Sequence, residues 1–502
     1  MNSFILHPEY LLLDPTAAYI QSAVAISDGR IAAIGNAAEL QLRYPTFPVR
    51  RLDRCILMPG FVNAHQHGRG ISQIQLGYRD DFLEPWIASR RARGVLDAYA
   101  IARLAALRMA ANGVTTAIHA NYAFGSGDYE AEVRGQIRAY REVGIRVAMC
   151  IGAMDQGMIA YPPHEACFCQ GLSPSLRDWV CGSGKNAYAG DGVATIALMD
   201  RLLADFGSDP GVRLLYGPAG PQWVSDGLWR ELAADALSKN LGIHFHGMES
   251  AAQQLATREL FPEGAYAHLE SLGALSPRTT IAHAVRVNDA DIEVIARTGA
   301  TVVRNPACNL RVRSGIAPMA QFLAKGIKVA IGTDNISLRD DEDLLGELRL
   351  ADLLARSPAL DGLPAPSTAQ LLEMITVNGA HAAGFGDETG TIVVGRSADL
   401  VAVSLDSTRH PYLDDDMPLM MAFLTKASGA DVRMTIVAGR IVYADGEFPG
   451  LDIAEVEANA VATAIAARRA RDPEAPARTA LLMGALNKHY RDLASAASKG
   501  SA

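Results

Sequence analysis

The sequence has few cysteines, no basic excess and no long hydrophobic run. Six cysteines among 502 residues are too sparse for a disulfide framework, so reduced thiols are expected. Cys167 and Cys169 have no second cysteine pair at zinc-finger spacing and are interpreted as loop or packing thiols.

The net charge is −9 at pH 7, and no cluster of Lys and Arg is interleaved with aromatic residues, which argues against nucleic-acid binding. No stretch approaches about 18 uninterrupted apolar residues, and the start lacks the basic segment of a signal peptide. We therefore expect a cytoplasmic protein that binds neither nucleic acid nor membrane.

Short aliphatic or β-branched runs alternate with segments of helical period. Eight such runs lie at residues 55–64, 113–119, 145–153, 212–219, 242–247, 279–285, 300–306 and 328–333. Helical patterns between them include 97–111, 131–143 and 289–297, each followed closely by a glycine. Near-continuous hydrophobicity is typical of parallel strands that are buried on both faces. The pattern predicts an α/β fold, a (β/α)8 TIM-type barrel.

The two ends of the chain show a different pattern. Residues 18–34, 390–405 and 432–447 are strand-like, and Asp-Gly or Ala-Gly turns break them. We predict a composite β-sandwich domain from residues 1–57 and 388–452, with the barrel domain, 58–387, inserted between its halves. Residues 453–502 are predicted to form a helical tail without a chemical motif.

Histidines gather at the ends of the predicted barrel strands, where barrel enzymes hold their chemistry. Six of the twelve histidines and one aspartate lie there: His65, His67, His119, His244, His246, His283 and Asp334. A single such histidine is ordinarily a satisfied core or loop residue, but the group together indicates a site. Imidazoles with a carboxylate and without cysteine suit a borderline divalent ion such as zinc or iron.

Two spacings bear on which of these residues converge. His65 and His67 lie two residues apart, so in a strand they share one face. The fifth run offers both His244 and His246 as ligands, and chemistry alone does not choose between them.

Several motifs resemble one known family. They are PGFVNAHQH (59–67), HFHGME (244–249), AH (282–283), SGIAP (314–318) and GTDN (332–335). As a set they are similar to the amidohydrolase superfamily, and within it to the mononuclear aminohydrolase branch that includes S-adenosylhomocysteine and guanine deaminases and the triazine hydrolases. The resemblance covers roughly residues 1–452.

The resemblance implies a specific ligand set. The fifth-strand ligand of that branch lies three residues before a glutamate, which selects His246 as ligand and Glu249 as acid/base. The implied metal ligands are then His65, His67, His246 and Asp334, with His283 over the open side of the metal and His244 behind the ligands. One divalent ion per chain is expected, zinc before iron, because the fourth run, 212–219, lacks the lysine that bridges two metals in binuclear relatives. A homo-oligomer is expected by the same analogy.

The implied activity agrees with the chemistry of these groups. A divalent cation lowers the pKa of its water from about 15.7 toward about 7. Asp334 can accept a proton from that water, Glu249 can carry a proton to a ring nitrogen and then to the leaving amine, and His283 can donate to the developing oxyanion or amine.

We therefore expect hydrolytic deamination of an amino-substituted nitrogen heterocycle of the purine, pterin, pyrimidine or triazine type. One alternative is hydrolysis of a ring amide, an alkylamino substituent or a carbon–halogen bond, although Glu249 favours an amine leaving group because a halide needs no proton. The other alternative is a metal-binding or scaffolding protein without turnover.

The substrate, a small molecule, is not identified by the sequence. The candidate contacts are Trp86, His119, Trp223, Arg286, Arg304 and Asn309. Tyr122 could stack on a flat ring. The arginines, with Arg311 and Arg313, either meet an acidic or carbonyl-rich substrate or pair with the acidic run 340–343. Arg69 either touches the substrate or faces solvent, and residues 155–190 could form a lid.

Overall fold

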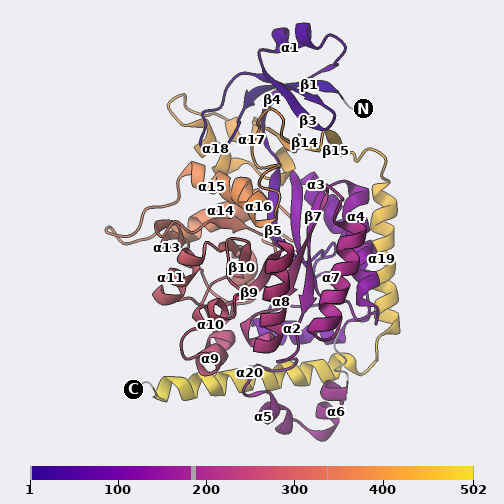
Figure 1. Cartoon of the computed structure of the whole chain (residues 1–502), viewed down its shortest axis with the longest axis vertical. Coiled ribbons are helices and arrows are strands. Elements are labelled where there is room, and N and C mark those ends of the chain that lie inside the picture. Colours follow the sequence, from indigo (N-terminus) through magenta and orange to yellow (C-terminus); the bar gives the residue numbers. More distant parts are fainter. Residues whose placement is uncertain (1–2, 183–187, 336, 501–502) are drawn as a thin grey trace.

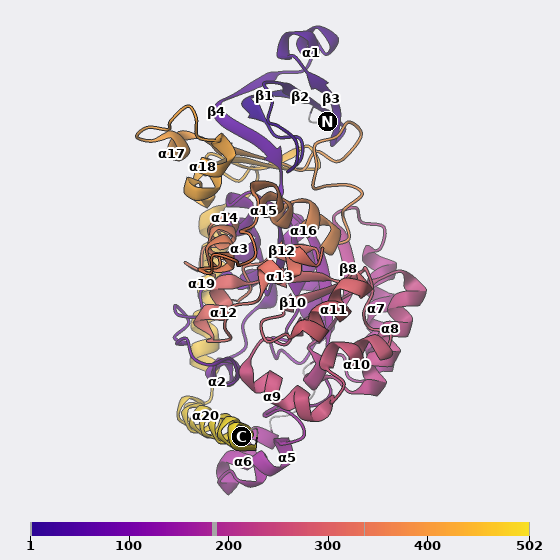
Figure 2. The same cartoon turned by 90° about the vertical axis from the view of Figure 1, so that its left-hand side faces the viewer.

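Two sheets organise the chain, and the barrel lies between the smaller sheet and the C-terminal helix. The computed structural model describes residues 3–182, 188–335 and 337–500. The sheet made by the chain ends lies above the barrel in Figure 1, and α20 (Ala475–Gly500) crosses below it. Figure 2 shows the same order from the side.

The barrel is an eight-stranded parallel sheet in sequential order, as predicted from the eight runs. Its strands are β5 (Phe61–Gln66), β6 (Val114–Ala120), β7 (Arg146–Ala153), β8 (Val212–Pro218), β9 (Gly242–Gly247), β10 (Thr279–His283), β11 (Thr301–Arg304) and β12 (Val329–Ile331). Apolar side chains such as Val62, Ile118 and Val303 fill its interior.

Strands from both ends of the chain share the second sheet, a seven-stranded mixed one. Its order is β15 (Arg440–Ala444), β14 (Val432–Val437), β13 (Leu400–Ser404), β4 (Val49–Pro59), β1 (Phe4–Leu11), β2 (Ala23–Ser27) and β3 (Arg30–Gly35). The central pairing of β13 with β4 joins segments that lie more than 300 residues apart in the sequence.

The first predicted run, 55–64, is two strands rather than one. β4 continues to Pro59 in the mixed sheet, and β5 begins the barrel at Phe61. The chain changes sheet at Gly60, where a Cβ would lie 2.3 Å from the Thr115 side chain. Uninterrupted hydrophobicity hides this change because both strands are buried.

The barrel closes where its first and last strands meet. A single bridge pairs Gln66 with Asp334, and the Asp334 backbone N–H donates to the His65 carbonyl over 2.9 Å. The closure therefore lies among the predicted metal ligands.

Helices surround the barrel, and polar caps fix where several of them begin. Asp97 caps α3 (Ala98–Ala111), and Asn288 forms a capping box with Asp291 at the start of α11 (Asp289–Thr298). Glycines in the left-handed region follow α3, α4 (Tyr129–Val143) and α11 at Gly113, Gly144 and Gly299, as expected. The remaining helices are α1 (Ala37–Arg43), α2 (Leu83–Ser89), η1 (Arg90–Ala92), α5 (Glu165–Gln170), α6 (Pro174–Gly182), α7 (Gly192–Phe206), η2 (Pro221–Trp223), α8 (Asp226–Lys239), α9 (Ala251–Leu260), α10 (Ala265–Ser271), α12 (Pro306–Arg311), α13 (Met319–Ala324), α14 (Leu344–Ala355), α15 (Thr368–Ile375), α16 (Val377–Ala382), α17 (Asp406–Arg409), α18 (Leu419–Lys426), η3 (Gly429–Asp431) and α19 (Ile453–Ala470).

The C-terminal segment forms two helices that pack against the barrel. α19 contacts α3, and α20 packs against α2, η1, α6 and α9. The Tyr161 backbone N–H donates to the Tyr490 hydroxyl over 3.0 Å, which ties α20 to the loop after β7. No described helix combines the length and hydrophobicity that crossing a bilayer requires.

A buried ion pair joins the mixed sheet to the barrel. Arg146 at the start of β7 donates from Nε to Asp399 over 2.6 Å, and both side chains are almost fully buried. Nη2 of Arg146 also donates to Oγ of Ser397, two residues before Asp399. This network fixes the mixed sheet against the amino ends of the barrel strands.

Candidate metal and acid–base site

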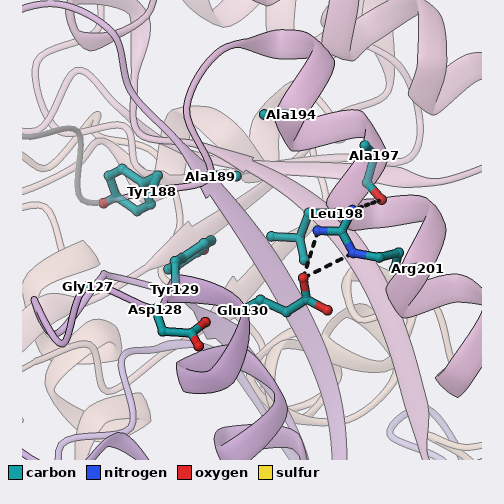
Figure 3. Close-up of a pocket in the computed structure, with 10 residues that line it drawn as sticks. All are labelled: Gly127, Asp128, Tyr129, Glu130, Tyr188, Ala189, Ala194, Ala197, Leu198 and Arg201. Carbon is teal, nitrogen blue, oxygen red and sulfur yellow. Dashed lines mark hydrogen bonds and ion pairs between the residues drawn. The ribbon is translucent and has the colours of Figure 1, made fainter.

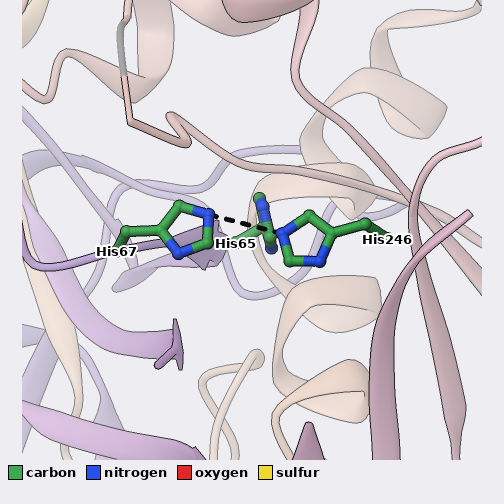
Figure 4. A group of neighbouring side chains, drawn as sticks. All are labelled: His65, His67 and His246. Carbon is green, nitrogen blue, oxygen red and sulfur yellow. Dashed lines mark hydrogen bonds between the residues drawn. The ribbon is translucent and has the colours of Figure 1, made fainter. Parts of the chain in front are cut away.

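Three histidines converge at the carboxyl ends of β5 and β9. His65 is the second-last residue of β5, His67 directly follows that strand, and His246 lies in β9; all three side chains are buried. Nε2 of His67 and Nε2 of His246 are 3.4 Å apart, with His65 beside them (Figure 4). The convergence predicted from the two-residue spacing is present in the structure.

The hydrogen bonds of these rings leave their lone pairs pointing at one another. Nδ1–H of His67 donates to the Ala120 carbonyl, and Nδ1–H of His246 donates to the Ala219 carbonyl over 2.9 Å. Each neutral ring then carries its lone pair on Nε2. The lone pairs of His67 and His246 therefore repel each other unless both bind the same electrophile. The buried Nε2 of His65 also lacks a hydrogen-bond partner. The donor set therefore fits a divalent cation.

Asp334 completes this group from the other side of the barrel closure. Its Oδ1 lies 3.1 Å from Nε2 of His67 and 3.4 Å from Nε2 of His65. Although burial raises the pKa of Asp334, the adjacent His65 and His67 hold it well below its usual value, so Asp334 is ionised. Its backbone is left-handed, with φ at 57°, a conformation that costs a non-glycine residue about 1–3 kcal/mol.

His244 lies one layer deeper than His246 on the same face of β9. Its Nε2 is 2.7 Å from Nδ1 of His65, and its Nδ1 is 2.5 Å from Oγ1 of Thr280. If His65 offers the lone pair of Nε2 to a cation, its Nδ1–H must donate to His244. His244 is thus placed to orient a ligand, which is the position the resemblance implied.

Glu249 lies two residues beyond β9, directly before the capped start of α9. Ser250 forms a capping box with Gln253, and the Glu249 backbone N–H donates to the Gln253 side chain. This turn holds the Glu249 carboxyl 3.5 Å from Nε2 of His283. Burial and the negative charges of Asp334 and Glu84 raise the pKa of Glu249 well above its usual value, so it holds a proton.

His283 ends β10 and is oriented by an amide. Its Nδ1 lies 2.9 Å from Oδ1 of Asn309, so Nδ1–H donates and Nε2 faces Glu249 and Asp334. Burial lowers the pKa of His283 to about 3, and the ring is neutral. Asn309, predicted as a substrate contact, bonds this ring, and its buried Nδ2 has no hydrogen-bond partner.

Cys308 is a site residue that the sequence did not identify. Its thiol, with Glu249 and Asp334, offers atoms that lie within 4.8 Å of one another. Burial raises the pKa of Cys308 well above its usual value, so the thiol is protonated beside the two carboxyls. The sequence contained one indication that Cys308 belongs to the site, because it lies on α12, just after the end of strand β11.

A cavity of about 340 Å³ opens onto His246. Tyr122 and Trp223, two of the aromatic residues predicted to stack on a flat heterocycle, both line it. The Tyr122 ring lies parallel to the His67 ring with centroids 4.2 Å apart, and the Trp223 ring stands edge-on to His246 at 6.5 Å.

Other predicted substrate contacts lie outside this cavity lining. Trp86 packs in a buried cluster with Cys308. His119 lies below the loop after β5, and its Nδ1 bonds the Tyr140 hydroxyl over 2.9 Å. Arg304 is fully buried and donates to the Ala317 carbonyl over 3.0 Å. Val303 faces the barrel interior, so the next side chain, Arg304, points outward.

Two further arginines have structural partners. Arg311 donates to Asp80 and Asp340. It therefore pairs with the acidic run 340–343, which was the alternative to a substrate contact. The Arg313 guanidinium lies 4.9 Å from the Phe82 ring centroid. Arg286 lies against Gly315, and its buried Nε has no hydrogen-bond partner.

The segment predicted as a lid borders the cavity. Gly157, Met158, Ile159, Tyr161 and Tyr188 from the described part of 155–190 line it, together with Tyr490 of α20. Residues 183–187 of that segment lie outside the described residues.

A second cavity, of about 310 Å³, lies between the starts of α4 and α7 (Figure 3). Arg201 in its wall donates to Glu130 over 2.7 Å, so these opposite charges neutralise each other. None of its described lining residues belongs to the histidine group.

A model of the amidohydrolase family matches residues 56–442, and a model of a bacterial imidazolonepropionase-like composite domain matches residues 23–46. The chain is 29% identical to a 5'-deoxyadenosine deaminase of Methanosarcina barkeri over 460 residues, covering 90% of this chain and 95% of that protein.

Solved structures share the architecture. An adenosine deaminase from Xanthomonas campestris with bound zinc superposes with a TM-score of 0.72 at 25% identity, covering 93% of this chain and 98% of that one. The atrazine chlorohydrolase TrzN from Arthrobacter aurescens, complexed with zinc, superposes with a TM-score of 0.76 at 22% identity, covering 92% and 100%. The second similarity concerns the fold alone.

Proposed function

The chain belongs to the amidohydrolase family, and we propose that it is a metal-dependent aminohydrolase that releases the exocyclic amine of a nitrogen heterocycle as ammonia. One observation carries the proposal. The carboxyl group of Glu249, Nε2 of His283 and the carboxyl group of Asp334 meet beside the three converging histidines.

We propose His65, His67, His246 and Asp334 as ligands of one divalent ion, with zinc as the first choice. Three imidazoles and a carboxylate suit zinc, and zinc-bound structures share this architecture. Strand β8 reads VRLLYGP and offers no lysine to bridge a second ion. A bound ion of this kind supplies an acidic water at neutral pH.

The side chains then divide the proton transfers. Water adds its oxygen to the ring carbon that carries the amine, and Asp334 is placed to accept the proton lost from that water. The protonated Glu249 donates to the ring nitrogen as the carbon becomes tetrahedral. The proton held by Asp334 then passes through Glu249 to the exocyclic nitrogen, the carbon–nitrogen bond breaks and ammonia leaves. The hydroxyl on the ring carbon loses its proton as the carbonyl forms, and that proton restores the protonated Glu249. Such transfers typically contribute about 10²- to 10⁴-fold.

His283 acts on the same face of the reacting carbon. Asn309 fixes the ring so that Nε2 points toward Glu249 and Asp334. A proton that passes between Glu249 and His283 turns His283 into a donor for the developing oxyanion or amine. The buried proton on Glu249 favours an amine leaving group, because a halide would leave without one.

The test is ammonia release from a panel of aminated rings, namely adenosine, guanine, pterin and a diamino-chloro-triazine. We expect at least one to release ammonia, and Glu249→Gln to keep its metal while it loses about 10²- to 10⁴-fold in kcat. Glu457→Gln, which changes an exposed glutamate on α19, is the matched control. A dehalogenated or ring-opened product without ammonia would overturn the proposal, and a near-normal rate for Glu249→Gln would remove that residue from the mechanism.

A further inference from the structure

Four arginines line the cavity that opens onto His246; Arg91 donates to the Met158 carbonyl over 3.3 Å, and the other three form one group. Arg69 lies in the loop after β5, Arg90 begins η1, and Arg93 follows η1. None of them was assigned a function by the motifs of the family, and the sequence left Arg69 open between substrate and solvent.

Aromatic rings, rather than acids, hold these cations in place. The Arg90 guanidinium lies 4.6 Å from the Tyr122 ring centroid, and those of Arg69 and Arg93 lie 4.7 Å and 5.8 Å from the Phe124 centroid. A cation over an aromatic face gains about 0.5–2 kcal/mol but keeps its full charge.

No carboxylate neutralises the group within residues 3–182, 188–335 and 337–500. Arg69 is 5% exposed and donates from Nε to the neutral amide of Asn335 over 3.2 Å. One terminal nitrogen of Arg69 and one of Arg93 are buried without any hydrogen-bond partner. Glu84, the only acid among the described lining residues, accepts hydrogen bonds from Ser250 and Tyr161 instead.

Three neighbouring cations in a partly buried wall repel one another. Burial and the charge of Arg90 lower the pKa of Arg93 to about 10, which still leaves it charged at neutral pH. Buried guanidinium groups that lack partners are costly unless an anion binds them.

The arginines also lie within reach of a substrate at the histidine group. Tyr122 stacks on His67 with centroids 4.2 Å apart, and the same ring carries Arg90. His246 and Arg90 both line the cavity of about 340 Å³, so one small heterocycle in it can contact both.

We propose that Arg69, Arg90 and Arg93 bind an oxyanion on the substrate, so that the enzyme acts on an acidic aminated heterocycle. A guanidinium fork matches the oxygens of a carboxylate or a phosphate. The reaction at the ring rests on the proposed function, whereas binding of the oxyanion does not.

The test uses two matched ligand pairs on the metal-loaded protein, pterin with pterin-6-carboxylate and adenosine with adenosine 5'-monophosphate. Calorimetry measures binding in a Glu249→Gln background, and ammonia release is measured separately in the otherwise native enzyme. The variants are Arg90→Gln and Arg93→Gln, which change partly exposed residues, with Arg93→Lys to keep the charge. Arg138→Gln, on the outer side of α4, is the control.

We expect one anionic member to bind more tightly than its neutral partner. Each Gln variant should weaken the binding of that anionic member by about 10- to 100-fold. Arg93→Lys should retain part of that affinity, and the neutral member should change by less than about threefold. The pair that responds identifies the oxyanion as carboxylate or phosphate. Equal binding within both pairs, or equal losses for both members, overturns the proposal even if ammonia is released. Arginine-dependent binding without ammonia from any compound upholds the oxyanion site and overturns the proposed reaction.

Discussion

His244 offers the sharpest test of how the metal ligands are oriented. It lies behind His65, and its Nε2 is 2.7 Å from Nδ1 of that ring. His244→Phe removes this acceptor and keeps a ring of similar size in a fully buried position. The Nδ1–H of His65 then has no partner, and the ring loses the contact that sets its tautomer and rotation.

The magnitude follows from two independent considerations. A buried donor left without a partner costs about 1–3 kcal/mol. Loss of a residue that orients a histidine ligand typically weakens metal binding by about 10- to 100-fold, which equals about 1.4–2.7 kcal/mol. The two ranges agree, so we expect His244→Phe to raise the zinc Kd by about 10- to 100-fold.

The assay is competition with a chelator of known affinity, with circular dichroism to confirm folding. His246→Phe removes a proposed ligand and should weaken binding much more than His244→Phe. Thr280→Val leaves the contact between His65 and His244 intact and should cost less. A folded His244→Phe protein with unchanged affinity would refute the orientation argument. A loss equal to that of His246→Phe would instead identify His244 as a ligand.

Further predictions concern the metal, the buried ion pair and one titrating group. Removing the metal with a chelator should abolish ammonia release, and restoring one zinc per chain should recover it; metal analysis that finds two ions per active chain would contradict the single-metal proposal. Asp399→Asn leaves Arg146 buried beside a neutral amide and should lower the free energy of unfolding by about 3–5 kcal/mol in urea titrations, whereas Asp53→Asn, in an exposed pair with Arg51, should cost less than about 1 kcal/mol. Equal losses of unfolding free energy in both variants would show that removing one partner of the buried pair costs no more than removing one partner of an exposed pair. Burial raises the pKa of Glu342 from 4.5 to about 7, so between these pH values the folded protein binds more protons than the unfolded chain, and its stability falls as pH rises, by up to about 3 kcal/mol. Glu342→Gln should flatten this slope, and a slope that persists in the variant would show that another group causes it.

Periodicity and strand ends made most of the barrel predictable. A hydrophobic run that ends in histidine marks both a buried strand and the carboxyl edge where chemistry lies, so His65, His67, His283 and the pair His244 and His246 could be predicted as one group. The choice of His246 over His244 came from the family resemblance. Their convergence needed only the two-residue repeat of a strand and the common edge of a parallel barrel.

Residues that depend on irregular backbone could not be predicted in the same way. Arg90 begins the short helix η1 and Arg93 follows it, in a segment between β5 and α3 that has no repeating pattern. Cys308 reaches the site only because α12 turns back over the barrel mouth after β11. The strand change at Gly60 was hidden because two consecutive buried strands have the same composition as one long strand.

The register of β11 explains why Arg304, which was predicted as a substrate contact, lies away from the site. A run of apolar residues shows that β11 is buried but not which of its faces points inward. Since Val303 faces the interior, Arg304 faces outward and Asn305 returns to the site beside His283. One residue of register therefore decides between a substrate contact and a structural cation.

The closure between β5 and β12 has a kinetic consequence for the loaded protein. His65 and His67 come from the first barrel strand and Asp334 from the last, so ligands more than 260 residues apart meet only when the barrel shuts. A half-formed chain holds no complete set of donors, and the ion has little to bind before that step. A bound metal should therefore slow the opening of the closed barrel and leave the folding rate nearly unchanged.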